Sequence, residues 1–180
     1  MVTSKEIYQK IMSPKAKPPT SIETWVNLFP FLEIMDWTIV YKLPFKTVSE
    51  PYLQSFQYKV INRILNCNER LKKWNIKDSE KCDYCDNVDT IEHHLHTCEE
   101  SQKIWCHLQK WLLDNLGTSL PFTVCEVMFG LTTMSSVEFN IINFLILLTK
   151  WYINRTKSQN QKLYFIDLLS VIREKIKIVT

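Results

Sequence analysis

The feature that most constrains the fold is a run of cysteines and histidines, C-D-Y-C-D-N-V-D-T-I-E-H-H-L-H-T-C, which begins at Cys82 and ends at Cys98. Cys82 and Cys85 are separated by two residues, so one tight turn can present both thiolates to the same ion. We expect a short helix after this turn to bring His93 and Cys98 to the same point. Three thiolates and one imidazole suit Zn²⁺, and four protein ligands leave no open position for water. The predicted site is therefore structural and not catalytic.

Other ligand sets remain open within and beside this run. His94 and His96 are alternatives to His93 as the imidazole ligand, although His96 is awkwardly close to Cys98 for two ligands on one helix. A set of four cysteines that includes Cys106 would leave seven residues between its last two ligands, which is an unusual gap for zinc. We take His93 as the predicted ligand.

Disulfides are the competing use of the cysteines, because the chain has six of them, an even number. The first residues, M-V-T-S-K-E-I, are polar and do not resemble a secretory signal. Cysteines beside histidines in an intracellular chain favour a metal site over disulfides. The longest apolar run, residues 139–153, is short and interrupted by polar residues, so we predict no membrane span. We expect an intracellular protein, nuclear or cytoplasmic, that is not secreted.

Scarce glycine and long segments with helical periodicity predict an all-α fold. Only Gly117 and Gly130 occur, which disfavours sandwiches, barrels and phosphate-binding glycine loops. Residues 31–42 are predicted to form one helix or two short ones, ended at Pro44. The other predicted helices span residues 4–12, 20–28, 50–66, 69–74, 99–116, 123–131, 137–157 and 161–178.

These elements predict an irregular helical bundle with a CCHC zinc knuckle between helices and a C-terminal helical hairpin. We divide the chain into three predicted parts. Residues 1–42 hold N-terminal helices and a proline-rich linker, residues 43–117 form the helical zinc-binding domain, and residues 118–180 form the hairpin packed on it.

The formal net charge is +3, and it is unevenly distributed. Residues 59–81 carry seven Lys and Arg against three acids, whereas residues 82–100 carry six acids and no Lys or Arg. The basic segment is either a solvated helix face or a surface that binds phosphate, with Tyr58 and Trp74 available for stacking on bases. The acidic zinc segment would repel phosphate, so nucleic acid would contact the flanking helices. The predicted phosphate contacts are Lys59, Arg63, Arg70, Lys72 and Lys73.

The sequence contains no motif typical of catalysis. It has no glycine-rich phosphate loop, no G-x-S-x-G and no H-E-x-x-H, and it lacks the paired aspartates of two-metal enzymes. We therefore predict a chain that is not an enzyme and that takes no small-molecule substrate.

Several motifs resemble a known family, the zinc-binding region downstream of the reverse transcriptase in non-LTR, LINE-type retrotransposons. The resemblance is strongest over residues 43–105, and its Cys-Cys-His-Cys order corresponds to Cys82, Cys85, His93 and Cys98. Where the family often has Leu-Phe and Phe-Trp, this chain has His94-Leu95 and Ile104-Trp105. The motifs are L-P-F-K-T-V-S-E-P-Y-L-Q-S-F-Q-Y-K-V-I-N-R-I-L (43–65), N-E-R-L (68–71), T-I-E-H (90–93) and K-I-W (103–105), with K-P-P-T-S-I-E-T-W (17–25) and I-N-F-L-I-L-L-T-K-W-Y-I (142–153) similar to flanking parts.

The resemblance implies a function without catalysis. In the family the polymerase and endonuclease lie upstream, so this chain is similar to a C-terminal remnant of such an element, in a region thought to grip template RNA or target DNA. We expect a zinc-stabilised module, with one structural Zn²⁺, that binds the backbone of RNA or of single- or double-stranded DNA with little sequence preference. The rival hypotheses are a structural or protein–protein interaction module, with self-association through the helices of residues 137–178, and a decayed reading frame without a selected function.

Overall fold

The computed structural model describes residues 3–4, 6–7, 17–132 and 137–179, and its contacts group into two compact units, residues 1–35 and 36–180. Within the described ranges the regular structure is helical, and the only β pairing is an isolated antiparallel bridge between Lys81 and Val88. The predicted all-α class is confirmed. The predicted helix of residues 4–12 lies mostly outside the described residues, and the domain boundaries after residues 42 and 117 stay predictions.

The first unit contains the helix α2 (Thr20–Leu28) and the 3₁₀ helix η1 (Pro30–Ile34). The N–H of Phe29 donates to the Trp25 carbonyl at 2.8 Å, which closes the last turn of α2, and the two rings stack with centroids 6.3 Å apart. The bounds of α2 agree with the helix predicted for residues 20–28.

The second unit begins with α3 (Trp37–Thr47), which Asp36 caps by accepting a hydrogen bond from the N–H of Thr38 at 2.8 Å. Residues 31–42 thus belong to two helices, η1 and α3. The predicted stop at Pro44 is wrong, since α3 continues through Pro44 to Thr47. Pro44 is buried, and packing of its ring in the core outweighs the hydrogen bond that its missing N–H would have made.

The helix predicted for residues 50–66 is shorter than expected. It is α4 (Pro51–Ile61), with Pro51 in the first turn, and Arg63 follows it with a positive φ of 55°, which no α-helix accommodates. Ile64 is consequently 39% exposed instead of buried on the apolar face. Gln57 is buried and donates through Nε2 to the Met128 carbonyl at 2.7 Å.

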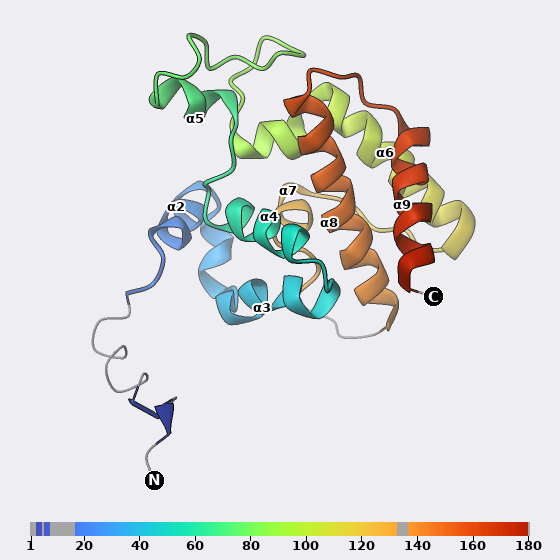
Figure 1. Ribbon diagram of the computed structural model, residues 1–180, viewed down its shortest axis with the longest axis horizontal. Helices are drawn as coiled ribbons and strands as arrows, with labels where there is room; N and C mark the ends of the chain where they lie inside the picture. Colours follow the sequence, from blue (N-terminus) through green and yellow to red (C-terminus); the bar gives the residue numbers. More distant parts are fainter. Residues whose placement is uncertain (1–2, 5, 8–16, 133–136, 180) are drawn as a thin grey trace. The chain divides into compact units, whose positions relative to one another are not determined.

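The remaining helices are α5 (Asn68–Lys73), the π-helical turn η2 (His93–Thr97), α6 (Glu99–Leu116), α7 (Val124–Phe129), α8 (Val137–Ser158) and α9 (Phe165–Val179). Gly117 ends α6 with a left-handed φ of 64°, and a capping box of Thr123 and Glu126 begins α7. Figure 1 shows α8 and α9 side by side, as the predicted C-terminal hairpin requires. No helix among the described residues is long and apolar enough to cross a bilayer.

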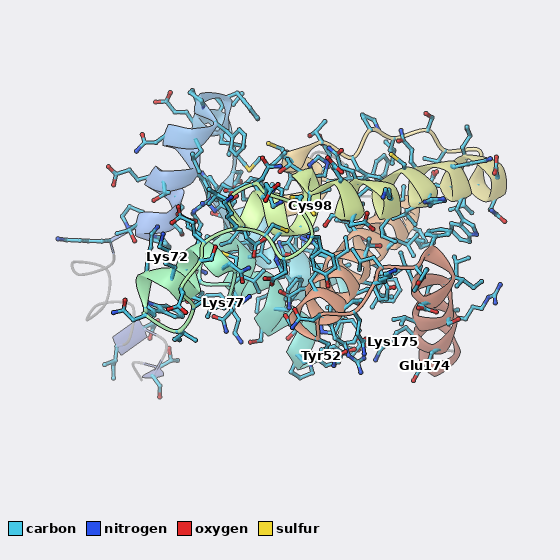
Figure 2. All side chains as sticks on the ribbon, turned by 90° about the horizontal axis from the view of Figure 1, so that it is seen from above. Tyr52, Lys72, Lys77, Cys98, Glu174 and Lys175 are labelled. Carbon is cyan, nitrogen blue, oxygen red and sulfur yellow. The ribbon has the colours of Figure 1, made fainter. Side chains whose placement is uncertain are left out.

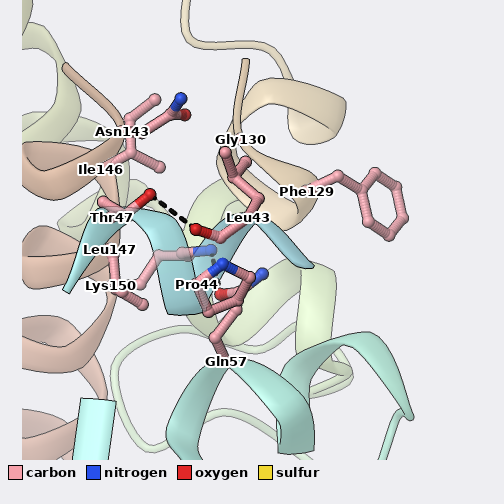
Figure 3. Close-up of a pocket in the computed structure, with 10 residues that line it drawn as sticks. All are labelled: Leu43, Pro44, Thr47, Gln57, Phe129, Gly130, Asn143, Ile146, Leu147 and Lys150. Carbon is pink, nitrogen blue, oxygen red and sulfur yellow. Dashed lines mark hydrogen bonds between the residues drawn. The ribbon is translucent and has the colours of Figure 1, made fainter. Parts of the chain in front are cut away.

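The central element of the second unit is α8, which packs against α3, α4, α7, α9 and η2. Its buried face includes a lysine, Lys150, which borders a small cavity of about 20 Å³ (Figure 3). The Lys150 ammonium donates to Gln57 Oε1 at 2.5 Å and to the Met128 carbonyl at 3.2 Å. No carboxylate pairs with it in the described part of the chain, and burial lowers the pKa of Lys150 to about 7.

Candidate metal centre

The first half of the metal centre is a tight turn that carries Cys82 and Cys85. The bridge between Lys81 and Val88 closes the base of this turn. The N–H of Cys82 donates to the Asn87 carbonyl at 2.8 Å, so the turn is held at its first ligand as well. The Asn87 side-chain amide lies 3.7 Å from the Cys85 sulfur and donates to it. The two thiols of the Cys-x-x-Cys pair are therefore presented together, as their spacing predicts.

The second half of the centre is the π-helical turn η2, where the sequence predicted an ordinary short helix. Its hydrogen bonds join residues five apart, and the N–H of Cys98 donates to the His93 carbonyl at 3.0 Å. An α-helix would rotate two residues at this spacing onto different faces, since its period is about 3.6 residues. The wider turn brings His93 and Cys98 to the same side.

Three side chains stabilise the π turn by donating hydrogen bonds to its backbone carbonyls. Trp105 Nε1 donates to the Leu95 carbonyl at 2.8 Å. The His94 carbonyl accepts from Ser101 Oγ at 2.9 Å and from Lys157 Nζ at 3.0 Å. These partners come from α6 and α8, so tertiary contacts stabilise the turn that positions the ligands.

The ligand atoms of Cys82, Cys85, His93 and Cys98 all lie within 4.8 Å of one another. The sulfurs of Cys82 and Cys98 are 3.9 Å apart, and the sulfur of Cys85 is 3.2 Å from His93 Nε2. A tetrahedral ion with Zn–S bonds of about 2.3 Å separates its sulfurs by about 3.8 Å. The soft donor set and these separations fit one structural Zn²⁺ with no open coordination position.

The structure brings His93, and neither of the alternative histidines, to the cysteines. His93 directs Nε2 to the cluster, and Nδ1 lies 3.4 Å from the Thr97 hydroxyl, the kind of outer partner that orients a ligating imidazole. His94 Nδ1 instead contacts the Asp89 carboxylate at 3.1 Å, and His96 Nε2 contacts the Phe122 carbonyl at 2.7 Å. Cys106 is exposed on α6 and is outside the cluster.

Lys157 of α8 supplies a buried positive charge beside the thiols. Burial opposes ionisation of Cys98, but a hydrogen bond from Lys157 and its charge outweigh this effect and lower the Cys98 pKa. Burial raises the pKa of Cys82 to about 12, although the charge of Lys157 acts in the opposite direction. Zinc requires thiolates, and three thiolates around Zn²⁺ leave one net negative charge. Lys157 is placed to balance this charge.

Sequence reasoning missed Lys157, although one signal was available. Lys150, Ile153 and Lys157 are spaced by three and four residues, so both lysines share the apolar face of the helix with Ile153. A lysine on an apolar face is rarely buried without a partner. For Lys157 that partner is the metal centre.

A hydrogen-bonded set of side chains connects the centre to the basic segment that precedes it. The buried Asp89 carboxylate accepts from the N–H of Asn68 at 2.9 Å and contacts His94. Burial opposes ionisation of Asp89, but these hydrogen bonds keep its pKa below its usual value. Arg63 forms an ion pair with Glu92, immediately before His93. The zinc segment thus fixes the chain between α4 and α6.

The five predicted phosphate contacts differ in their surroundings. Lys59 is exposed on α4. Lys72 pairs with Glu80 at 3.1 Å and Lys73 with Glu69 at 2.7 Å, and all these side chains are partly exposed. Arg63 is largely buried against Glu92, whereas Arg70 donates to the Arg63 carbonyl and lies over the Trp74 ring at 4.6 Å. In Figure 2, Lys72 lies at the α5 end of the second unit.

A family described as zinc-binding in reverse transcriptase matches residues 3–105. The chain belongs to this family. The match includes the whole Cys82–Cys98 segment, so the zinc-binding character of the family and the Cys₃His cluster support one zinc ion at this centre. The matched region is the zinc-binding part of reverse transcriptases and not a polymerase domain. No curated protein and no solved structure matches the chain.

Proposed function

We propose that this reverse transcriptase zinc-binding chain is a non-catalytic module that binds the phosphate backbone of RNA or DNA. The observation that carries the proposal is the position of Lys59, Lys72 and Lys73, which are at the surface on both sides of the segment that the metal centre fixes. Lysine ammonium groups bind backbone phosphates by displacing condensed counterions, and this interaction needs no particular base sequence.

The intramolecular salt bridges of the lysines are compatible with this role. Exposed pairs such as Lys73 with Glu69 contribute only about 0–1 kcal/mol, so a phosphate can replace the carboxylate at little cost. Arg63 and Arg70 would have to leave partners that are more buried. We therefore propose that the three lysines make most of the phosphate contacts.

The zinc contributes by holding these cations in place. Six acids between residues 82 and 100 keep phosphate away from the metal itself. The ion pair of Arg63 with Glu92 and the hydrogen bond from Asn68 to Asp89 transmit the fixed geometry of the knuckle to the segment before α5. Loss of zinc should therefore weaken nucleic-acid binding even though no nucleotide touches the metal.

A salt series tests the proposal. The affinities of the zinc-loaded protein for a single-stranded RNA, a single-stranded DNA and a duplex are measured against salt concentration. Replacement of Lys59, Lys72 and Lys73 by Glu should weaken binding to all three and reduce the slope of log K against log salt by about one per lost contact. The matched control replaces Lys42, Lys46 and Lys110, which are also exposed, and changes the net charge equally. Equal losses in the two triple variants would refute a defined phosphate surface.

A protein interaction module is the second candidate, and exposed apolar side chains on α9 favour it. Ile166 is 61% exposed and Ile176 is 50% exposed. A partner or a second copy that covered this helix would remove these side chains from water. Molar mass measured by light scattering over a range of concentrations tests self-association. A mass that stays at the monomer value would remove this candidate for the isolated protein.

A further inference from the structure

A second surface feature lies apart from the metal centre, in a groove of about 400 Å³ between α4 and α8. This volume is within the range of roughly 300–1,000 Å³ that is typical of small-ligand sites. None of the four metal-cluster residues lines it. The groove residues on which the argument rests are Tyr52, Phe56, Lys59, Ile64, Trp151 and Asn154.

Two aromatic side chains form part of the groove wall and remain accessible. Tyr52 is 41% exposed, and Trp151 is partly exposed on the facing helix. Their ring centroids are 5.5 Å apart and their planes are tilted by 57°, so neither ring covers the other by flat stacking. Exposed rings in a concave site favour a planar, apolar-faced ligand.

The charges around the groove favour an anionic ligand. Lys59 lines the groove and Arg155 lies over the Trp151 ring at 5.2 Å, and both cations are exposed. No carboxylate is among the described residues that line the groove. The Lys175 ammonium lies over the Tyr52 ring (Figure 2), and it is 3.7 Å from the carboxylate of Glu50. Among the described residues that line the groove, the charge is therefore positive.

One polar atom in the groove lacks a hydrogen-bond partner. Asn154 Oδ1 is buried, and no donor in the described part of the chain reaches it. Because this oxygen is closed to solvent, it does not offer a direct contact to a ligand in the groove. Aromatic walls and two cations together match the ring face and the phosphates of a nucleotide.

We propose that the groove between α4 and α8 binds an unpaired base of single-stranded nucleic acid, stacked on Trp151 with Tyr52 against its edge, and with its phosphates at Lys59 and Arg155. The proposal rests on the proposed function and extends it, because backbone contacts alone do not distinguish single strands from duplexes. A base in a duplex is stacked and paired, so it cannot present its face to a groove between two helices. Base stacking on aromatic side chains also requires no particular sequence.

The test compares two single strands of equal length, one with bases and one with abasic sites, and the corresponding duplex. The wild-type protein should bind the strand with bases about tenfold to hundredfold more tightly than the abasic strand. Trp151→Ala should abolish this difference and leave the affinity for the abasic strand and for the duplex unchanged. Because Trp151 is partly buried, Tyr52→Ala provides a second, more exposed variant, and Trp151→Phe should retain most of the preference. Thermal unfolding establishes that each variant is folded.

Trp111→Ala is the matched control, since Trp111 is a partly exposed tryptophan on α6 that does not line the groove. It should retain the full preference for bases. Salt-dependent binding that is equal for abasic strands and strands with bases would overturn the groove proposal and leave the proposed function intact. A preference that survives both Trp151→Ala and Tyr52→Ala would also overturn it. Absence of binding to any strand would overturn both.

Discussion

Replacement of Lys150 by Met should make the free energy of unfolding less dependent on pH between about 7 and 10.5. Lys150 is buried on α8 with two neutral acceptors, Gln57 Oε1 and the Met128 carbonyl, and burial lowers its pKa from 10.5 to about 7. Below pH 7 the Lys150 amine is protonated in both the folded and the unfolded protein, so the folded protein bears the full cost of a buried charge. Between pH 7 and 10.5 only the unfolded state retains the proton, so the free energy of unfolding rises with pH.

The size of the effect follows from the pKa change. A shift of one pKa unit corresponds to 1.36 kcal/mol, so the change from 10.5 to about 7 amounts to about 5 kcal/mol across this window. Lys150→Met removes this contribution and leaves Gln57 Oε1 without its donor, which costs about 1–3 kcal/mol at every pH. The variant should therefore be more stable than the wild type near neutral pH and less stable near pH 10.5.

The assay is urea unfolding of both zinc-loaded proteins, followed by circular dichroism at several pH values from 6 to 10.5. The difference in the free energy of unfolding should change by up to about 1.4 kcal/mol per pH unit within the window. The matched control is Lys110→Met, at an exposed position on α6, for which the difference should not grow with pH. A difference for Lys150→Met that is independent of pH would show that the ammonium is not desolvated in the folded state.

Three further changes test the metal centre and the packing around α8. Cys98→Ser, or removal of zinc with a chelator, should unfold much of the second unit, because structural zinc contributes about 10–16 kcal/mol in zinc-finger peptides and whole domains are stable by only about 5–15 kcal/mol. Metal analysis and circular dichroism measure the zinc content and the helical structure. A Cys98→Ser variant that holds one zinc and has wild-type stability would contradict this prediction. Lys157→Met should weaken zinc binding about tenfold to hundredfold in competition with a coloured chelator, whereas Lys162→Met, at an exposed site, should not. Gly130→Ala should destabilise the protein by about 1–3 kcal/mol in thermal unfolding, because φ is 80° and the new Cβ would lie 2.7 Å from Asn143 Oδ1. Gly117→Ala is the control, since its φ is 64° and no atom lies within 4 Å of the new Cβ. This control should cost only the backbone strain of about 1–2 kcal/mol.

Local sequence was sufficient to predict the helices and the donor set. The apolar spacing of residues 99–116 and 137–157 predicts α6 and α8 to within one residue, because each helix buries one face and its periodicity records that face. Cys82, Cys85 and Cys98 are recognisable because thiolates at these spacings suit zinc whatever surrounds them. Both properties depend on residues that are close together in the chain.

Local sequence failed where distant contacts decide the conformation. The helix predicted through Asn66 ends at Ile61, and Arg63 adopts a positive φ and pairs with Glu92, which is 29 residues away. The packing of Pro44 in the core similarly overrides its tendency to end a helix. No window of neighbouring residues contains the groups that compensate for these local costs.

The metal centre shows the same division. Composition and spacing favoured three cysteines and one histidine over a set of four cysteines, but they left three histidines as candidates. The tertiary structure brings His93 to the cysteines, because α6 and α8 stabilise a π turn in which His93 and Cys98 share one side. The decisive contact joins Lys157 to the carbonyl of His94, 63 residues earlier, and the same ammonium balances the charge of the thiolates. A charge that must be buried needs a partner, and only the folded chain brings that partner to it.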